Sequence, residues 1–194
     1  MEIIITDLTR FSNPEIVCIA GINPTTGECI RPLPYIKLSK CQEFDILPGN
    51  VITGDFKKIS NLDKPHVEDC NYEKLTKVKV CNSEEFEELL ENDIVNNIEI
   101  VKDGFKEGKI RLNLLDNDGK RFSYLSITDL GFYNYAMEHF HDPDFPNIIN
   151  NFIRKQKTVF LRVGLGREYQ DGFWLQINGI YTFPNFDSEI RSYH

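Results

Sequence analysis

One histidine and two carboxylates that lie close together in the chain are the candidates for catalysis. His66, Glu68 and Asp69 fall on an expected loop. Because Mg²⁺-dependent nucleases hold their ion with carboxylates, this run predicts a metal-dependent, nuclease-like enzyme as one alternative. The prediction requires the loop to fold back toward further ligands. We favour a polar loop without a chemical role, and expect a protein that is not an enzyme and has no cofactor and no metal.

A second set of residues suits binding rather than catalysis. The alternation of the last expected strand, residues 173–183, predicts one face that carries an aromatic ring and two amides: Trp174, Gln176 and Asn178. A flat ring can stack on any base, and amides can read base edges. Arg162 and Arg167, on the partner strand and at its end, could meet phosphate. Alternatively, Trp174 and Ile180 seal an interface between two modules.

Two arginines of the first half form a comparable pair. Arg10 and Arg31 each lie at the end of an expected strand. Each could contact a ligand, or could form a structural ion pair that fixes the loop near Asp7. Arg167 occupies the matching place in a later hairpin, which favours the structural role.

The charge balance argues against a protein that binds nucleic acid through an overall positive charge. The net charge is −8. Most of it lies in residues 82–97, which hold six acidic and no basic side chains, whereas the segments on either side are nearly neutral. Local basic patches on either half are compatible with this distribution.

The cysteines and the hydropathy indicate a cytoplasmic protein with no membrane association. The five cysteines are widely spaced and include no C-x-x-C pair, so we expect reduced thiols rather than disulfides or zinc ligands. No apolar run approaches the length of a membrane span. The first residues also lack the features of a secretion signal.

The order of expected elements divides the chain in two. Residues 1–81 read as a β module with five short strands, at 3–6, 16–22, 29–33, 50–56 and 75–81. A capping box at Asn82 and Glu85 begins an acidic amphipathic connecting helix over residues 82–97. Residues 98–194 read as a second β module: a hairpin at 110–128, a helical insertion over about 130–156, and a closing hairpin at 159–183.

The first and last hairpins also resemble each other in sequence. Residues 5–22 and 162–180 both run strand, Leu-x-Arg, polar loop, strand, Gly-Ile. This echo predicts that one supersecondary unit is used twice. Chance agreement between two hairpins with the same turn chemistry is the alternative.

Several runs together resemble the dual OB-containing domain family of prokaryotes. They are T-D-L-T-R-F-S, V-C-I-A-G-I, G-E-C-I-R-P, P-H-V-E-D and the closing L-G-R … W-L-Q-I-N-G-I-Y-T-F-P. The resemblance covers residues 1 to about 186 and implies a mainly β fold with a few helices, built of two small OB-like antiparallel β-barrels packed as one compact unit. It also implies nucleic acid as the ligand class, and carries over no catalytic residue.

The leading expectation is therefore a non-catalytic OB-type binding protein for single-stranded RNA or DNA or for a nucleotide. Its expected ligand-binding residues are Trp174, Gln176, Asn178, Arg162, Arg167, Arg10 and Arg31. Besides the nuclease-like enzyme, a protein-protein interaction module that docks a protein partner through the acidic helix and the aromatic hairpin is a further alternative.

Overall fold

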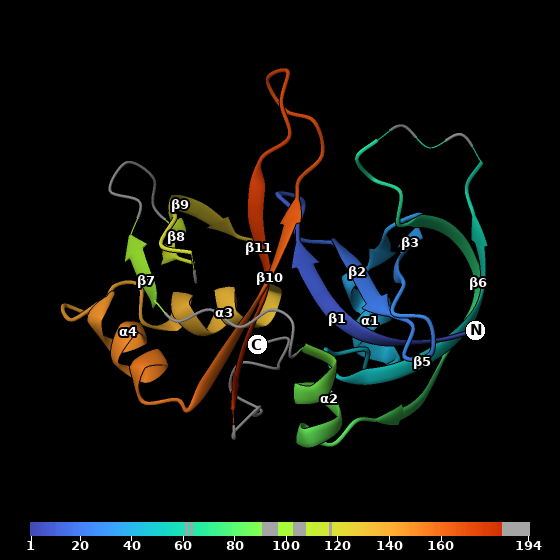
Figure 1. The fold of residues 1–194 in the computed structure, drawn as a ribbon, viewed down its shortest axis with the longest axis horizontal. Coiled ribbons are helices and arrows are strands. Elements are labelled where there is room, and N and C mark those ends of the chain that lie inside the picture. Colours follow the sequence, from blue (N-terminus) through green and yellow to red (C-terminus); the bar gives the residue numbers. More distant parts are fainter. Residues whose placement is uncertain (61, 63, 91–96, 103–107, 117, 184–194) are drawn as a thin grey trace. The chain divides into compact units, whose positions relative to one another are not determined.

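The computed structural model describes residues 1–60, 62, 64–90, 97–102, 108–116 and 118–183. The chain divides into two compact units, Met1–Leu89 and Leu90–His194. The fold is mainly β, with one sheet in each unit (Figure 1). Each unit is described separately below.

Unit 1 contains six strands and two helices among the described residues. They are β1 (Glu2–Arg10), β2 (Ile16–Ile22), β3 (Cys29–Leu33), β4 (Ile36–Lys37), α1 (Leu38–Glu43), β5 (Asn50–Lys58), β6 (Asp69–Val80) and α2 (Ser83–Leu90). The strands expected at 16–22 and 29–33 are confirmed at those bounds. β6 begins at Asp69, six residues before the expected start, and the sequence did not predict β4 or α1.

The strand pairings of unit 1 form a circuit. β1 pairs with β2, β2 with β3, β3 with β6, β6 with β5, and β5 with β1. All of these pairs are antiparallel except β3–β6, which is parallel and sets Arg31 opposite Asp69. The expectation of purely antiparallel modules is therefore wrong. The connection from β3 to β6 is long enough to return the chain in the same direction, as a parallel pair requires.

Helix α2 follows the predicted capping box. The Glu85 backbone N–H donates to Asn82 Oδ1 over 2.8 Å, and the Asn82 N–H donates to Glu85 Oε2 over 3.0 Å. Phe86 and Leu90 are fully buried beneath an acidic outer face. Of the helix expected over 82–97, residues 91–96 lie outside the described residues.

Unit 2 contains five strands and two helices among its described residues. They are β7 (Asn97–Lys102), β8 (Ile110–Leu115), β9 (Arg121–Ile127), α3 (Leu130–Glu138), α4 (Asn147–Arg154), β10 (Thr158–Leu165) and β11 (Leu175–Phe183). Their order in the sheet is β10-β11-β9-β8-β7, and β9 and β11 are parallel. The helical insertion and both hairpins lie close to their expected bounds, whereas β7 was not predicted.

The two units share one pairing order. In each, three successive strands pair antiparallel, the third pairs in parallel with the last, and the last pairs antiparallel with the strand before it. The hairpins of the sequence echo, β1–β2 and β10–β11, are therefore the first pair of one unit and the last pair of the other. Their resemblance reflects common hairpin chemistry and not equivalent positions.

One face of the unit 2 sheet is covered by α3 and α4. Phe132 and Ile149 pack with strand residues such as Leu112 in one buried cluster. Ile177 and Ile180 both belong to this cluster, although alternation placed them on opposite faces. A bulge causes the difference: Val163 pairs with Ile177 and Arg162 with Gly179, so the residue between them has no partner on β10.

Candidate functional site

The face of the unit 2 sheet opposite the helices carries a row of paired residues. Arg111 on β8 pairs with Ser126 on β9, and Ser126 pairs with Gln176 on β11. Gln176 pairs in turn with Gly164 on β10. Directly paired residues project from the same face of a sheet. We call Arg111, Ser126, Gln176 and Gly164 the outer strip.

The arginine of the outer strip is held against the sheet. Arg111 Nη1 lies 2.9 Å from the Tyr124 carbonyl oxygen and 3.1 Å from Ser126 Oγ, and donates to both. These bonds anchor one edge of the guanidinium. The side chain is therefore positioned over β9 instead of extending freely into solvent.

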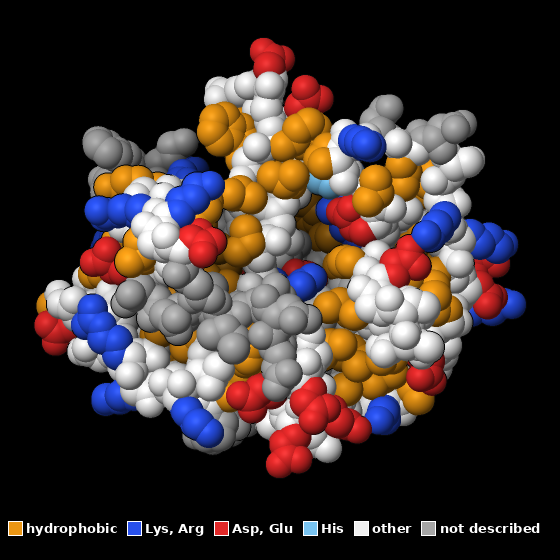
Figure 2. All heavy atoms as spheres, viewed as in Figure 1, with side chains coloured by type: hydrophobic (Ala, Val, Ile, Leu, Met, Phe, Trp, Pro, Cys, Tyr) orange, Lys and Arg blue, Asp and Glu red, His pale blue; other side chains and the backbone are white. Residues whose placement is uncertain are grey.

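Two exposed aromatic residues lie on or next to the strands of the outer strip. Tyr124, on β9, is 63% exposed, and Trp174, which directly precedes β11, is 60% exposed. The indole N–H donates to the Tyr169 carbonyl oxygen over 2.9 Å, which holds the ring in place. Hydrophobic side chains gather on the projecting connection between β10 and β11, and acidic ones lie at its end (Figure 2). The acidic residues of this connection are Glu168 and Asp171.

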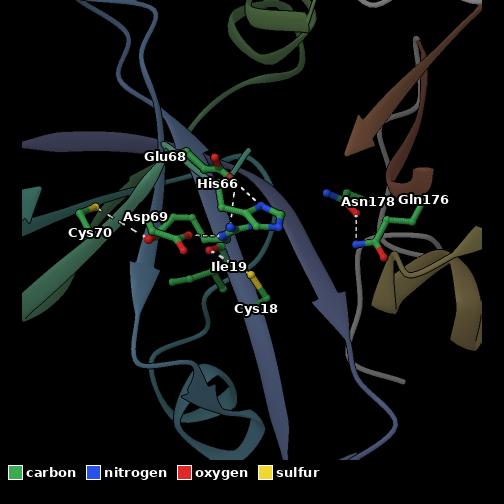
Figure 3. A network of polar contacts seen from close by, with 9 residues as sticks. Cys18, Ile19, His66, Glu68, Asp69, Cys70, Gln176 and Asn178 are labelled. Atoms are coloured by element: carbon green, nitrogen blue, oxygen red, sulfur yellow. Dashed lines mark hydrogen bonds and ion pairs between the residues drawn. The ribbon is translucent and has the colours of Figure 1, made fainter. Parts of the chain in front are cut away.

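The two predicted amides bind each other. Gln176 Nε2 donates to Asn178 Oδ1 over 2.9 Å, and Thr128 Oγ1 lies 3.1 Å from the same oxygen. Figure 3 shows the Gln176 and Asn178 side chains turned toward one another. Only part of each amide is thus engaged inside the protein.

The two arginines predicted for the second half lie at different depths. Arg162 is half-buried and lies two residues before Gly164 on β10, which places it on the face of the outer strip. Arg167 is exposed and lies beyond the end of β10. Both make further polar contacts within the chain.

In unit 1 the predicted loop residues surround Arg31. Its Nε lies 2.5 Å from Asp69 Oδ1, and its Nη2 lies 2.9 Å from Glu68 Oε1. His66 Nδ1 lies 3.5 Å from the same Glu68 oxygen. Arg31 is 9% exposed and Asp69 2% exposed. These side-chain contacts join β3 to the start of β6. The backbone does so as well, because the Arg31 N–H donates to the Glu68 carbonyl oxygen.

The ion pairs of Arg31 occupy the carboxylates that the nuclease alternative would need for a metal ion. Because Arg31 sits against both carboxylates, it competes with any cation for their oxygens. Within the described part of the chain, which includes His66, Glu68 and Asp69, no group of three or more His, Cys, Asp or Glu side chains could hold a metal ion. The geometry gives the nuclease-like enzyme no support.

Arg10 lies at the end of β1 and is half-buried. Next to it, Phe11 packs on Tyr35 with ring centroids 4.6 Å apart. The sequence placed both arginines at strand ends and offered Asp7 as a carboxylate, whereas Arg31 lies in the middle of β3 and its ion-pair partners are Glu68 and Asp69. Asp69 is the first residue of β6, and Glu68 lies in the loop before it. Both residues are far from Arg31 in the sequence and come close to it because β3 pairs with β6.

Two of the thiols lack the features of nucleophiles. The five cysteines, all in the described part of the chain, form no disulfide. Burial raises the pKa of the Cys41 thiol to about 12. Burial, followed by the nearby charges of Asp69 and Glu28, also raises the pKa of Cys70. Since the thiolate is the reactive form, neither thiol is activated at neutral pH.

Sequence reasoning missed Arg111, Tyr124 and Ser126. They lie in strands that the sequence predicted, alternating with the buried Leu112, Leu125 and their neighbours. Alternation alone could have assigned Arg111 and Ser126 to an exposed face. Nothing local indicates that this face continues onto β11, because the β9–β11 pairing joins segments about fifty residues apart.

Comparison with protein-family models, with curated proteins and with solved structures finds no significant match to this chain. None of the helices in the described residues has the length and apolar character needed to cross a membrane.

Proposed function

We propose that this chain is a non-catalytic binding protein of two OB-type barrels, related to the dual OB-containing domain family, and that unit 2 binds single-stranded nucleic acid. An OB barrel is a five-stranded Greek-key barrel. The circuit of pairings in unit 1, which returns to β1, supports a closed barrel of this type. The same pairing order in unit 2 supports a second barrel.

The placement of the outer strip supports the ligand class. OB barrels bind oligonucleotides on the face of their second and third strands and on the loops that follow the first and fourth. In unit 2 these correspond to β8, β9 and the connection between β10 and β11. The observation that carries the proposal is that the exposed Tyr124 lies beside Arg111 on β9, and that the exposed Trp174 directly precedes the β11 strand of the same face.

The chemistry of the face fits a single strand. Exposed rings stack on unpaired bases, which a duplex keeps inside its own stack. Arg111 and Arg162 supply positive charge on the sheet. Glu168 and Asp171 repel phosphates from the far end of the projecting connection, so the strand should cross the sheet and the base of the connection, where Trp174 joins β11.

Fluorescence anisotropy with labelled single-stranded RNA and DNA tests the proposal. We expect Trp174→Ala to weaken binding by about 1–3 kcal/mol, as loss of one stacking contact does. Phe44→Ala, at an exposed aromatic residue of unit 1, is the matched control and should bind as the wild type does. Affinity should fall as salt rises. Absence of binding at tens of micromolar protein in low salt would refute the proposal.

A protein-interaction module is the second candidate. It is favoured by the exposed apolar side chains on and beside the β10–β11 connection: Val163, Tyr169, Phe173 and Leu175. Such a patch suits an apolar partner surface. A complex that survives high salt and is lost on Phe173→Ser, with no change in oligonucleotide binding, would favour this function.

A further inference from the structure

Tyr124 has a backbone conformation that a bulky residue rarely adopts. Its φ is 59°, in the left-handed region, although the residue lies within β9. In this region the Cβ of an L-residue lies too close to the following carbonyl oxygen, so glycine or asparagine is the usual choice. A strained residue that the surrounding structure holds in place is typical of binding sites.

The unusual conformation occurs at a bulge in the β8–β9 pair. The register shifts between Leu112 and Leu114, so two residues of β9, Ser123 and Tyr124, lie opposite the single residue Asn113. Both bulge residues are exposed, whereas strict alternation would turn one of them toward the core. The bulge thus leaves Tyr124 two residues before Ser126, on the face of the outer strip.

Two side chains of β8 hold this backbone conformation. The Tyr124 N–H donates to Asn113 Oδ1 over 2.9 Å, and Arg111 Nη1 donates to the Tyr124 carbonyl oxygen over 2.9 Å. Glu99 orients Asn113 in turn, because Asn113 Nδ2 donates to Glu99 Oε2 over 3.3 Å. Both backbone groups of Tyr124 therefore have fixed partners before any ligand binds, which lowers the entropy cost of using its side chain.

The Tyr124 ring contributes little to the stability of the fold. The residue is 63% exposed, so only a small part of its apolar surface is removed from water. A residue that accepts the left-handed conformation would form the same bulge with less strain. An aromatic ring at this position is therefore explained by a contact outside the fold.

We propose that the strain at Tyr124 is retained for ligand binding, and that the β9 bulge, with Asn113 as its positioning residue, holds the Tyr124 ring as a stacking platform at the centre of the unit 2 site. The inference rests on the proposed function and locates its site at the bulge. A base can stack on a ring whose direction is already set, and every base has a π-face.

Tyr124→Asn separates binding from folding, because asparagine tolerates the left-handed conformation and has no ring. We expect its anisotropy-measured affinity for a single-stranded oligonucleotide to fall by about fivefold or more, the loss of one stacking contact. Its Tm should equal or exceed that of the wild type. Lys74→Asn is the matched control, at an exposed residue within β6 of unit 1 whose φ is also positive, 56°. It should leave the affinity unchanged.

A double-mutant cycle measures the positioning role of Asn113. Asn113→Ala should weaken binding by the wild-type protein but cause no further loss in Tyr124→Asn, since the ring that it positions is then absent. Equal losses in both backgrounds, an unchanged affinity of Tyr124→Asn or a clear fall in its Tm would overturn this inference while the proposed function stands. Failure of the wild type to bind the oligonucleotide would overturn the proposed function itself.

Discussion

Arg31 shows how burial determines the contribution of an ion pair to the stability of the fold. Arg31 is 9% exposed and contacts Glu68 and Asp69, so removing one carboxylate leaves a desolvated charge that only the other carboxylate compensates. The ion pair of Lys74 with Asp55, with a 3.4 Å separation, lies in solvent, where water screens it.

We expect Asp69→Ala to lower the free energy of unfolding by about 3 kcal/mol. Asp55→Ala, which removes an exposed partner of the same type, should cost at most about 1 kcal/mol. Urea unfolding of both variants measures the difference. Similar, small losses in the two variants would show that the Arg31 cluster contributes little to stability.

Replacing a glycine by alanine should also cost different amounts of stability on the two sheets. A Cβ at Gly21 would lie 2.5 Å from the Ile4 carbonyl oxygen, a backbone atom of the paired strand. At Gly164 the obstacle is the end of the Asn178 side chain, which can turn away. Gly21→Ala should therefore lower the free energy of unfolding by about 2–3 kcal/mol, and Gly164→Ala by about 1 kcal/mol or less. Thermal unfolding that ranks the two in the reverse order would contradict this account.

Among single residues, the sequence indicated the chemistry of Trp174 and the amides but not their contacts. Alternation predicted that Gln176 and Asn178 share a face. It could not reveal the bulge that brings Ile177 and Ile180 into one core or turns Asn178 over Gly164, because bulges depend on the partner strand.

At the scale of elements, α4 is fastened to β7 by one side chain. Asn150 Oδ1 accepts from the Ile100 N–H over 2.7 Å, and Asn150 Nδ2 donates to the Ile100 carbonyl oxygen over 3.0 Å. Asn150 is buried. The helix thus satisfies two backbone groups of β7, which lies at the edge of the sheet.

Asn150→Ala should lower the free energy of unfolding by about 2–3 kcal/mol, because it leaves both Ile100 groups without their bonds. Asn151→Ala, at the exposed neighbouring position, is the matched control and should have little effect. Hydrogen exchange of the Ile100 amide should accelerate in the first variant alone. Unchanged exchange would show that Asn150 does not hold β7.

Helix α2 should show a pH-dependent contribution from Glu85. The hydrogen bond from the Asn82 N–H, assisted by Lys79, holds the pKa of Glu85 below its ordinary value of 4.5. A lowered pKa in the folded state stabilises the fold above 4.5, and this stabilisation is lost as pH falls through the folded value. The difference in unfolding free energy between the wild type and Glu85→Gln should therefore shrink on acidification. A difference that stays constant with pH would contradict this.

Most elements were predictable because their signals are local. The capping box of α2, the continuous apolar run of β2 and the alternation of β8 depend on neighbours in the sequence. The first half of β6 was not predictable: Asp69 and Asn71 are polar, and they form a strand because they pair with the distant β3. Propensity carries no information about such a partner.

At the scale of the molecule, the common pairing order of the two units is the main result about architecture. The sequence suggested two modules through the echo of the first and last hairpins. Those hairpins occupy different places in the pairing order. The echo therefore suggested two similar modules, but it did not show which strands of the two units correspond. Strand order arises from long-range pairing, which the local sequence pattern does not record.

The charge of the whole chain limits how the proposed single-stranded ligand could be held. Every lysine of β5 and β6 pairs with an acidic side chain: these are Lys57, Lys58, Lys74, Lys77 and Lys79. With a net charge of −8 as well, long-range attraction for phosphate is weak. If the proposed function holds, the affinity must come from stacking and from the arginines on the unit 2 face.

The most direct test of that claim uses the intrinsic fluorescence of Trp174, since the chain contains one tryptophan. Unlabelled single-stranded oligonucleotide is titrated into the protein in low salt. If bases stack on the indole, its emission should change saturably, with the same midpoint as the anisotropy titration and at a higher concentration when salt is added. Binding seen by anisotropy with no change in tryptophan emission would contradict the account.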